Sequence, residues 1–211
     1  VRSWMGFGAV QFVAAWLVWT AGAEDGGWWV HGTGTPGSVR VDSLITARCI
    51  AFAFSRPVII RGVTDNTRFR VLCSRSGLLQ RYGSLTVRLS TANTHSYRKV
   101  DVAFQDYVDR LLRPQDAAAL GSETLYFFGD NNLTEWQNLL DRYRAPPYFL
   151  PGRSAAYSFG IAGPGTGVPF HWHGPGFSEV IYGRKVLYFP DRWWHATLNL
   201  DTTVFISTFL G

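Results

Sequence analysis

Lysine and cysteine are scarce in this sequence. Lys99 and Lys185 are the only lysines among 211 residues, and the other basic residues are arginines scattered singly along the chain. The formal net charge of +5 is therefore typical of a solvated surface, and no basic run or nucleic-acid-binding motif is present. The two cysteines, Cys49 and Cys73, could form one disulfide in an oxidising compartment or remain as two buried thiols.

Long apolar runs are also scarce, and the one that occurs lies near the start. Arg2 precedes an apolar run over residues 6–20, and Ala21-Gly22-Ala23 supplies small residues at the spacing of a cleavage site. This pattern predicts a secretory signal peptide over residues 1–23, with an uncleaved signal anchor as the alternative. Because no second apolar run of membrane length follows, we expect no membrane span in the mature chain.

Aromatic residues are abundant, at 16% of the chain, and 46% of the residues are hydrophobic. This composition favours a β-sandwich or barrel whose facing sheets are filled by rings, in a chain long enough to bury one core. Residues 24–54 begin with a Gly-, Thr- and Ser-rich stretch, and we interpret them as a linker and lead-in. Residues 55–211 then form a single domain.

Mixed elements are expected in the first part of this domain, residues 55–150. Strands are predicted over Pro57–Ile60, Leu85–Ser90 and Leu125–Phe128. Apolar residues at helical spacing predict helices over Thr67–Tyr82 and Ala103–Leu112, and Thr134 with Gln137 forms a capping box for a third helix. We interpret the aromatic stripes of these helices as core.

The second part, residues 151–211, has the alternating, β-branched and aromatic character of strands throughout. The six strands expected there cover Ser154–Ala162, Val168–His173, Ser178–Tyr182, Val186–Phe189, His195–Leu200 and Val204–Phe209.

Three of the five histidines, namely His171, His173 and His195, lie close together in this second part. In an extended strand successive side chains alternate between faces, so His171 and His173 point the same way. Neutral imidazoles at this spacing can bind one zinc, iron, copper or nickel ion. The alternative is that the histidines only form hydrogen bonds inside a barrel.

The block VPFHWHGPGFSEVIYGRK, residues 168–185, and the later YFPDRWWHATLN, residues 188–199, resemble the JmjC domain. The resemblance implies a double-stranded β-helix, the jelly roll of the cupin superfamily, with flanking helices. It also implies that His171, His173 and His195 occupy the positions of the Fe(II) ligands. Lys185 matches the lysine that pairs with the 2-oxoglutarate carboxylate, although a strand-end lysine reaching solvent is the alternative.

Two departures from the JmjC pattern affect these expectations. His173 replaces a carboxylate ligand, for which Glu179 and Asp191 are the candidate substitutes. His171 and His195 are only 24 positions apart, where the JmjC pattern places several more strands. We therefore predict that a segment is missing near Lys185–Val186 and that the β-helix is incomplete, with at most six of about eight strands.

The resemblance and its departures together imply a regulatory protein of the endoplasmic-reticulum lumen. Such a protein would act through protein partners, with links to tumour-necrosis-factor and NF-κB signalling and to metabolism, and without robust oxygenase activity. The alternatives are an Fe(II)- and 2-oxoglutarate-dependent protein hydroxylase and a zinc- or copper-binding cupin without redox chemistry. Asn132-Leu133-Thr134 is an N-glycosylation sequon, which agrees with passage through the secretory pathway.

Overall fold

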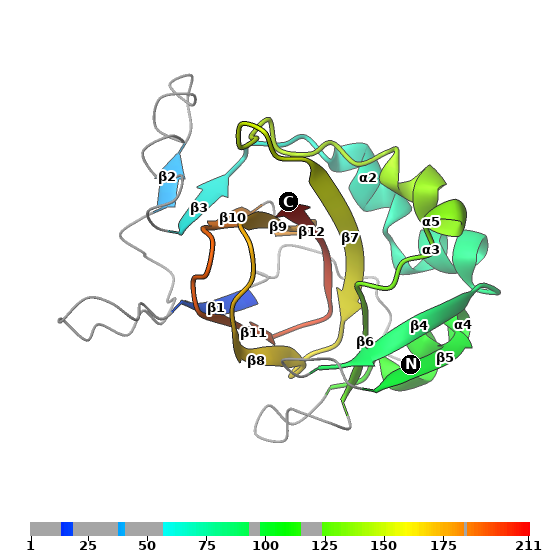
Figure 1. The fold of residues 1–211 in the computed structure, drawn as a ribbon. Coiled ribbons are helices and arrows are strands. Elements are labelled where there is room, and N and C mark those ends of the chain that lie inside the picture. Colours follow the sequence, from blue (N-terminus) through cyan, green and yellow to red (C-terminus); the bar gives the residue numbers. More distant parts are fainter. Residues whose placement is uncertain (1–13, 19–37, 41–56, 93–97, 115–123, 184) are drawn as a thin grey trace.

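The structure, a computed structural model, describes residues 14–18, 38–40, 57–92, 98–114, 124–183 and 185–211 (Figure 1). Of the predicted signal peptide and linker, only strands β1 (Ala14–Val18) and β2 (Ser38–Arg40) are therefore included. The signal peptide at residues 1–23 and the linker at 24–54 stay predictions. Among the described residues no helix is long and apolar enough to cross a membrane.

Two β-sheets face each other across the domain (Figure 1). The larger has the strand order β2-β3-β10-β9-β12-β7-β6-β4-β5, and the smaller has the order β1-β11-β8. The six predicted strands of the second part are all present, as β7 (Ala155–Ala162), β8 (Gly167–His171), β9 (Gly176–Val180), β10 (Lys185–Phe189), β11 (His195–Asn199) and β12 (Thr203–Leu210). The predicted mainly β jelly roll with flanking helices is confirmed.

The two facing sheets receive unequal numbers of strands from residues 151–211. The larger sheet takes β10, β9, β12 and β7 from this part, whereas the smaller takes only β11 and β8. The second edge of β11 pairs with β1, from Ala14 against Asn199 to Val18 against His195. The smaller sheet is thus short of strands from the second part, as expected for an incomplete β-helix.

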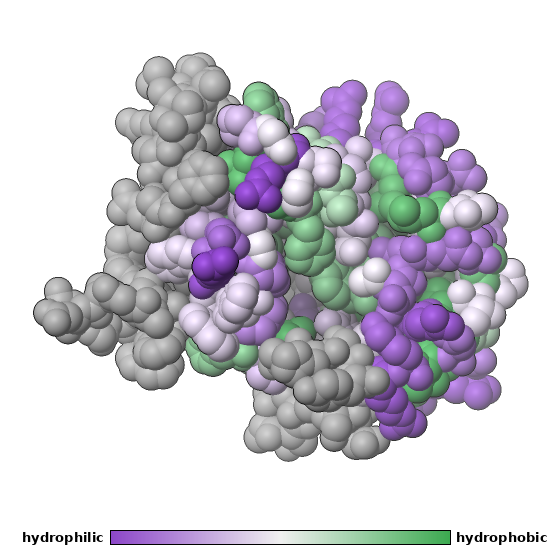
Figure 2. All heavy atoms as spheres, viewed as in Figure 1, coloured by the Kyte–Doolittle hydropathy of each residue, from purple (hydrophilic) through white to green (hydrophobic). Residues whose placement is uncertain are grey.

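The first part of the domain contributes strands β3 (Val58–Arg61), β4 (Thr86–Thr91), β5 (Lys99–Ala103) and β6 (Leu125–Phe128). Its helices are α2 (Thr67–Leu72), α3 (Arg75–Tyr82), α4 (Phe104–Asp106), the π-helix η1 (Tyr107–Leu111) and α5 (Leu133–Leu140). Helices α2, α3 and α5 lie beside β7, outside the barrel (Figure 1), and hydrophilic side chains cover much of their outer side (Figure 2).

Three details of the predicted helices were wrong. The helix expected over Thr67–Tyr82 is split, because extended Ser74 accepts a hydrogen bond from Gly77 N and begins a new helix. The helix expected from Ala103 begins at Phe104, since Ala103 ends β5, a strand that the sequence did not predict. The N-cap of α5 is Asn132, whose side chain accepts from Thr134 N, so Thr134 is not the cap.

The aromatic stripes form the core between the helices and the larger sheet, as predicted. Trp136 of α5 is 1% exposed. Its ring stacks on Tyr82 at 4.5 Å and lies 5.2 Å from Phe127 and 5.5 Å from Phe159, between ring centroids. Cys73 belongs to the same core, where it is a free thiol whose pKa is raised by burial. Cys49 lies outside the described residues.

Glu179 is a buried carboxylate on the outer face of β9. Its carboxylate accepts hydrogen bonds from Thr64 Oγ1 at 2.6 Å, Asn66 Nδ2 at 3.1 Å and Tyr143 OH at 2.8 Å. Thr64 and Asn66 precede α2, and Tyr143 follows α5, so these contacts fasten both helical segments to the barrel. A fully buried carboxylate is tolerated because each oxygen has donors.

Replacing Glu179 should therefore destabilise the fold to an extent that depends on the replacement. Glu179→Ala leaves three donors unpaired and should cost about 3 kcal/mol or more. Glu179→Gln should cost clearly less, since its amide oxygen can accept from Thr64 and Asn66 while its amide nitrogen donates to Tyr143. Urea unfolding of both variants measures the difference; equal losses would contradict this role for the carboxylate.

Candidate metal centre

The pairing of β8 with β11 brings two of the predicted ligands together. His171 ends β8 and His195 begins β11, and the two residues are directly opposite in the antiparallel register. Their ring centroids are 4.3 Å apart. The prediction that β8 continues to His173 was wrong, because the strand ends at His171.

His173 nevertheless joins the other two histidines from the loop after β8. Its ring centroid lies 5.4 Å from that of His171 and 4.7 Å from that of His195. The backbone N–H of Arg192 donates to His173 O at 3.0 Å, which ties this loop to the one before β11. One ligand atom from each histidine lies within 4.8 Å of those of the other two.

Backbone carbonyls fix the orientation and tautomer of all three rings. The Nδ1 atoms lie 2.9 Å from Pro169 O in His171, 2.8 Å from Gly174 O in His173 and 2.8 Å from Trp193 O in His195. A carbonyl can only accept a hydrogen bond, so each Nδ1 must carry the proton. Each neutral ring then has its lone pair on Nε2, the atom that can bind a metal.

Burial keeps these imidazoles neutral. It lowers the pKa values of His171 and His173 below 6.5, and it lowers the pKa of His195 to about 4, with smaller contributions from the other two rings. Aromatic side chains provide much of this burial: Phe189 stacks on His195 at 5.1 Å, and Phe189 and Phe209 lie 4.8 and 5.2 Å from His173. The centre can therefore present three lone pairs at neutral pH.

Neither candidate carboxylate joins the histidines. Glu179 faces the helices on the outer side of β9, with the contacts described above, and Asp191 is exposed beside Arg192 at 3.6 Å. Within the described ranges, the group of side chains placed to hold a metal here contains histidines alone. The position expected for a carboxylate ligand is thus occupied by His173.

A cavity of about 360 Å³ lies next to the three rings, between the two sheets. Its wall includes Phe189, Phe205 and Phe209 on the larger sheet, and it also includes Lys99 and Asp130. The sequence did not predict that Lys99 would lie here. The scarcity of lysine in the sequence could have drawn attention to Lys99. Its position was missed because strand β5, on which it lies, was not predicted.

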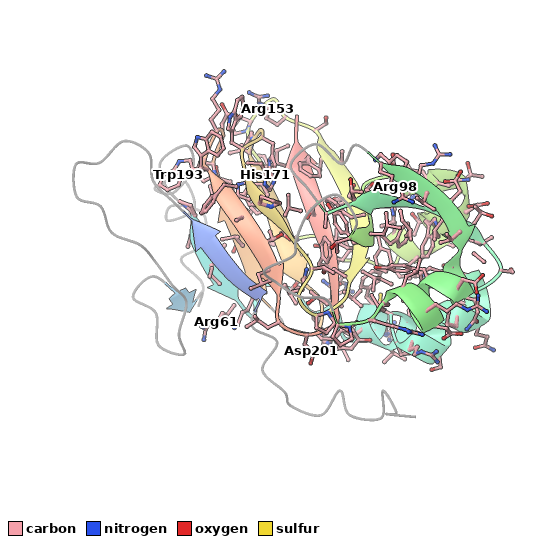
Figure 3. All side chains as sticks on the ribbon, turned by 90° about the horizontal axis from the view of Figure 1, so that it is seen from below. Arg61, Arg98, Arg153, His171, Trp193 and Asp201 are labelled. Carbon is pink, nitrogen blue, oxygen red and sulfur yellow. The ribbon has the colours of Figure 1, made fainter. Side chains whose placement is uncertain are left out.

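Lys185 is not in the wall of this cavity. It begins β10, opposite Arg61 of β3, and burial together with the charge of Arg61 lowers its pKa. The histidines contact Phe189, at the other end of β10, which is about 13 Å from Lys185 along an extended strand. Figure 3 shows His171 and Arg61 toward opposite ends of the barrel. The contact of Lys185 with a 2-oxoglutarate carboxylate stays a prediction.

No family model matches the chain. Among curated proteins, JmjC domain-containing protein 8 of Mus musculus is 48% identical over an alignment of 262 positions, gaps included, that covers 97% of each chain. The chain belongs to the family of JmjC domain-containing protein 8. The human member of the JmjC domain-containing protein 8 family is 50% identical over an alignment of 259 positions that covers 96% of this chain and 97% of the human one.

These alignments also bear on the missing segment. They run over 259–262 positions, whereas this chain has 211 residues, so both relatives carry residues within the aligned region that this chain lacks. The location of the gap at Lys185–Val186 stays a prediction.

Among solved structures, YcfD, a ribosomal oxygenase from Escherichia coli, in complex with cobalt and succinic acid, is 16% identical with a TM-score of 0.47, covering 80% of this chain and 52% of YcfD.

The low pKa of His195 predicts how stability depends on pH in the metal-free protein. In the unfolded chain the His195 imidazole takes up a proton near pH 6.5, whereas in the folded chain it does so only near pH 4. The free energy of unfolding is therefore highest above pH 6.5 and falls as the pH is lowered from 6.5 to 4. His195 alone should account for about 3 kcal/mol of this loss. Urea unfolding at pH 7, 5.5 and 4 with a chelator should therefore show a shallower decline for His195→Gln than for the unsubstituted chain. Parallel declines would contradict the assignment.

Proposed function

We propose that this chain is a metal-binding JmjC protein of the endoplasmic-reticulum lumen that acts mainly through protein partners. The observation that carries the proposal is the set of three imidazoles with their Nε2 atoms free for one metal ion. Three neutral nitrogen ligands suit zinc, copper, nickel or iron. A bound ion would act as a Lewis acid and, as iron, would supply oxidation chemistry.

The absence of robust oxygenase activity is part of the proposal. A carboxylate ligand places negative charge on the metal and favours its oxidised states, and His173 supplies none. The ligand group found among the described residues contains no carboxylate. The second candidate, an Fe(II)- and 2-oxoglutarate-dependent protein hydroxylase, is favoured by the cavity beside the histidines, which is large enough for a small cosubstrate.

Exposed tryptophans next to the metal centre support a role in binding proteins. Trp172 lies between two of the histidines and is 50% exposed, and Trp194 immediately precedes His195 and is 39% exposed. Arg192 lies over the ring of Trp172, 5.9 Å from its centroid. Tryptophan and arginine dominate the binding energy of protein interfaces. The regulatory role that we propose lies in tumour-necrosis-factor and NF-κB signalling and in metabolism, as the family resemblance implies.

Metal binding is tested by titrating the chelator-treated protein with Zn(II) in a calorimeter. His171→Ala should weaken binding at least about 100-fold, because one of three ligands is lost. Asp191→Asn is the matched control, since this nearby exposed carboxylate should contribute nothing. Undiminished binding by His171→Ala would overturn the proposed centre.

In parallel, anaerobically iron-loaded protein should release little succinate from 2-oxoglutarate; robust release that His171→Ala abolishes would establish the hydroxylase instead.

Residence in the secretory pathway predicts a glycan on Asn132. The residue is exposed, and the side-chain oxygen that caps α5 leaves the amide nitrogen available for modification. Protein from secretory-pathway expression should lose mass on enzymatic removal of N-glycans, and Asn132→Asp should not. Aspartate is an equally good N-cap, so this variant should keep its stability within about 0.5 kcal/mol. An unglycosylated Asn132 would count against the luminal location.

A further inference from the structure

We propose that a hollow beside Asn132 binds the innermost sugar of a glycan carried by that residue. The hollow has a volume of about 380 Å³ and is lined by the β4–β5 hairpin, the turn after β6 and the start of α5. Its volume lies in the range of small-molecule sites, about 300–1,000 Å³. None of the described residues in its wall is a histidine, so it is separate from the metal centre. The inference rests on the glycan proposed above and assigns it a binding site.

The polar wall of the hollow is held in place by contacts within the protein. Arg88 on β4 is opposite Asp101 on β5, and its Nε and Nη2 atoms donate to the two carboxylate oxygens at 2.7 and 2.8 Å. In the turn after β6, Asn131 Nδ2 donates to Phe159 O at 3.0 Å, and Asn131 Oδ1 accepts from Phe159 N at 2.7 Å. A ligand that binds here therefore has few protein side chains to order, which lowers the cost of binding.

A buried donor without a partner points to a ligand. Trp136 is 1% exposed, yet it lines the hollow. Its indole N–H donates to no described residue and is not sealed from solvent, so a group bound in the hollow can reach it. An indole nitrogen can only donate a hydrogen bond, and a buried donor usually has an acceptor. The hollow thus lacks an acceptor that a ligand oxygen would supply.

The charges in the wall favour a neutral ligand rich in hydroxyl groups. Asp101 pairs with Arg88 and Asp130 pairs with Lys99, so an ionic ligand of either sign would compete with an ion pair. Unused hydrogen-bonding groups remain, because Arg88 uses two of its five N–H donors and Asp130 binds Lys99 through one of its two oxygens. A sugar can accept from Arg88 and Trp136 and donate to Asp130.

Asn132 is placed to deliver such a sugar. It is exposed and belongs to the wall of the hollow, and its side-chain oxygen accepts from Thr134 N at 3.1 Å as the N-cap of α5. This bond orients the amide whose nitrogen would carry the glycan. A sugar attached there has an effective concentration on the order of mM or higher, so even weak contacts with the wall hold it in the hollow.

Hydrogen exchange at Trp136 tests the contact in protein from secretory-pathway expression with isotope-labelled tryptophan. One sample is trimmed enzymatically to a single N-acetylglucosamine on Asn132, and a second is stripped of all sugar, which converts Asn132 to aspartate. The Trp136 indole N–H should exchange with water about fivefold more slowly in the single-sugar sample, because a hydrogen bond to the sugar protects it. The indole of Trp194, which is outside the hollow, is the internal control and should not change.

Arg88→Met tests whether the wall of the hollow holds the sugar. The Arg88–Asp101 pair is exposed, so its loss should leave the fold intact. The variant should lose most of the protection that the sugar gives Trp136, since the guanidinium no longer anchors the sugar. Arg110→Met is the matched control, because its exposed ion pair with Asp106 lies outside the hollow, and it should keep the protection.

The outcomes separate the hollow from the glycan itself. Equal exchange at Trp136 in the two samples, or protection that Arg88→Met keeps, would overturn the hollow as a sugar site and leave the glycan on Asn132 standing. If Asn132 carries no glycan, the proposed glycan fails, and the protein is titrated with free N-acetylglucosamine. Slower exchange at Trp136 that Arg88→Met abolishes would then still support a sugar site, and unchanged exchange would overturn it as well.

Discussion

The antiparallel pairing of β8 with β11 is the contact on which the centre depends. It places His171 opposite His195, and it is held by side-chain as well as backbone bonds, since Val168 N donates to Thr197 Oγ1 at 2.9 Å. The strands approach so closely that a Cβ on Gly167 would lie 1.8 Å from Thr197 O. Glycine at this position is therefore a requirement of the pairing, and through it of the distance between the two imidazoles.

The residues that hold the helices on the larger sheet and the residues that line the cavity lie on opposite faces of that sheet. The helices α2, α3 and α5 are fastened to the larger sheet by an aromatic core and by Glu179, all on the side of β7 and β9 away from the cavity. The cavity side carries the histidines, the phenylalanines that bury them and, on the β4–β5 hairpin, Lys99. Buried polar residues on the helix side of the larger sheet, such as Glu179, thus bind the helical segments, whereas those on the other side face the cavity.

Much of this arrangement could be predicted from the sequence. The strands of residues 151–211 follow from alternation. The grouping of the histidines was also predicted, but His173 reaches it from the loop after β8 and not through a strand repeat. The rest depends on contacts that local patterns do not contain. Ser74 splits a helix through its own hydrogen bond, and β5 is recognisable only once it pairs with β4. Whether Lys99 or Lys185 lines the cavity likewise depends on how the strands pair.

The pairing of β1 with β11 would be affected by removal of the predicted leader. Residues 14–18 occupy the second edge of the strand that begins with His195, yet they fall within the predicted leader. If that leader is removed, the backbone groups along this edge of β11 lose their partners, and an open edge can accept an extended segment from another chain. Proteolytic processing would then both release the protein from its targeting sequence and decide which strand borders the histidine that completes the centre.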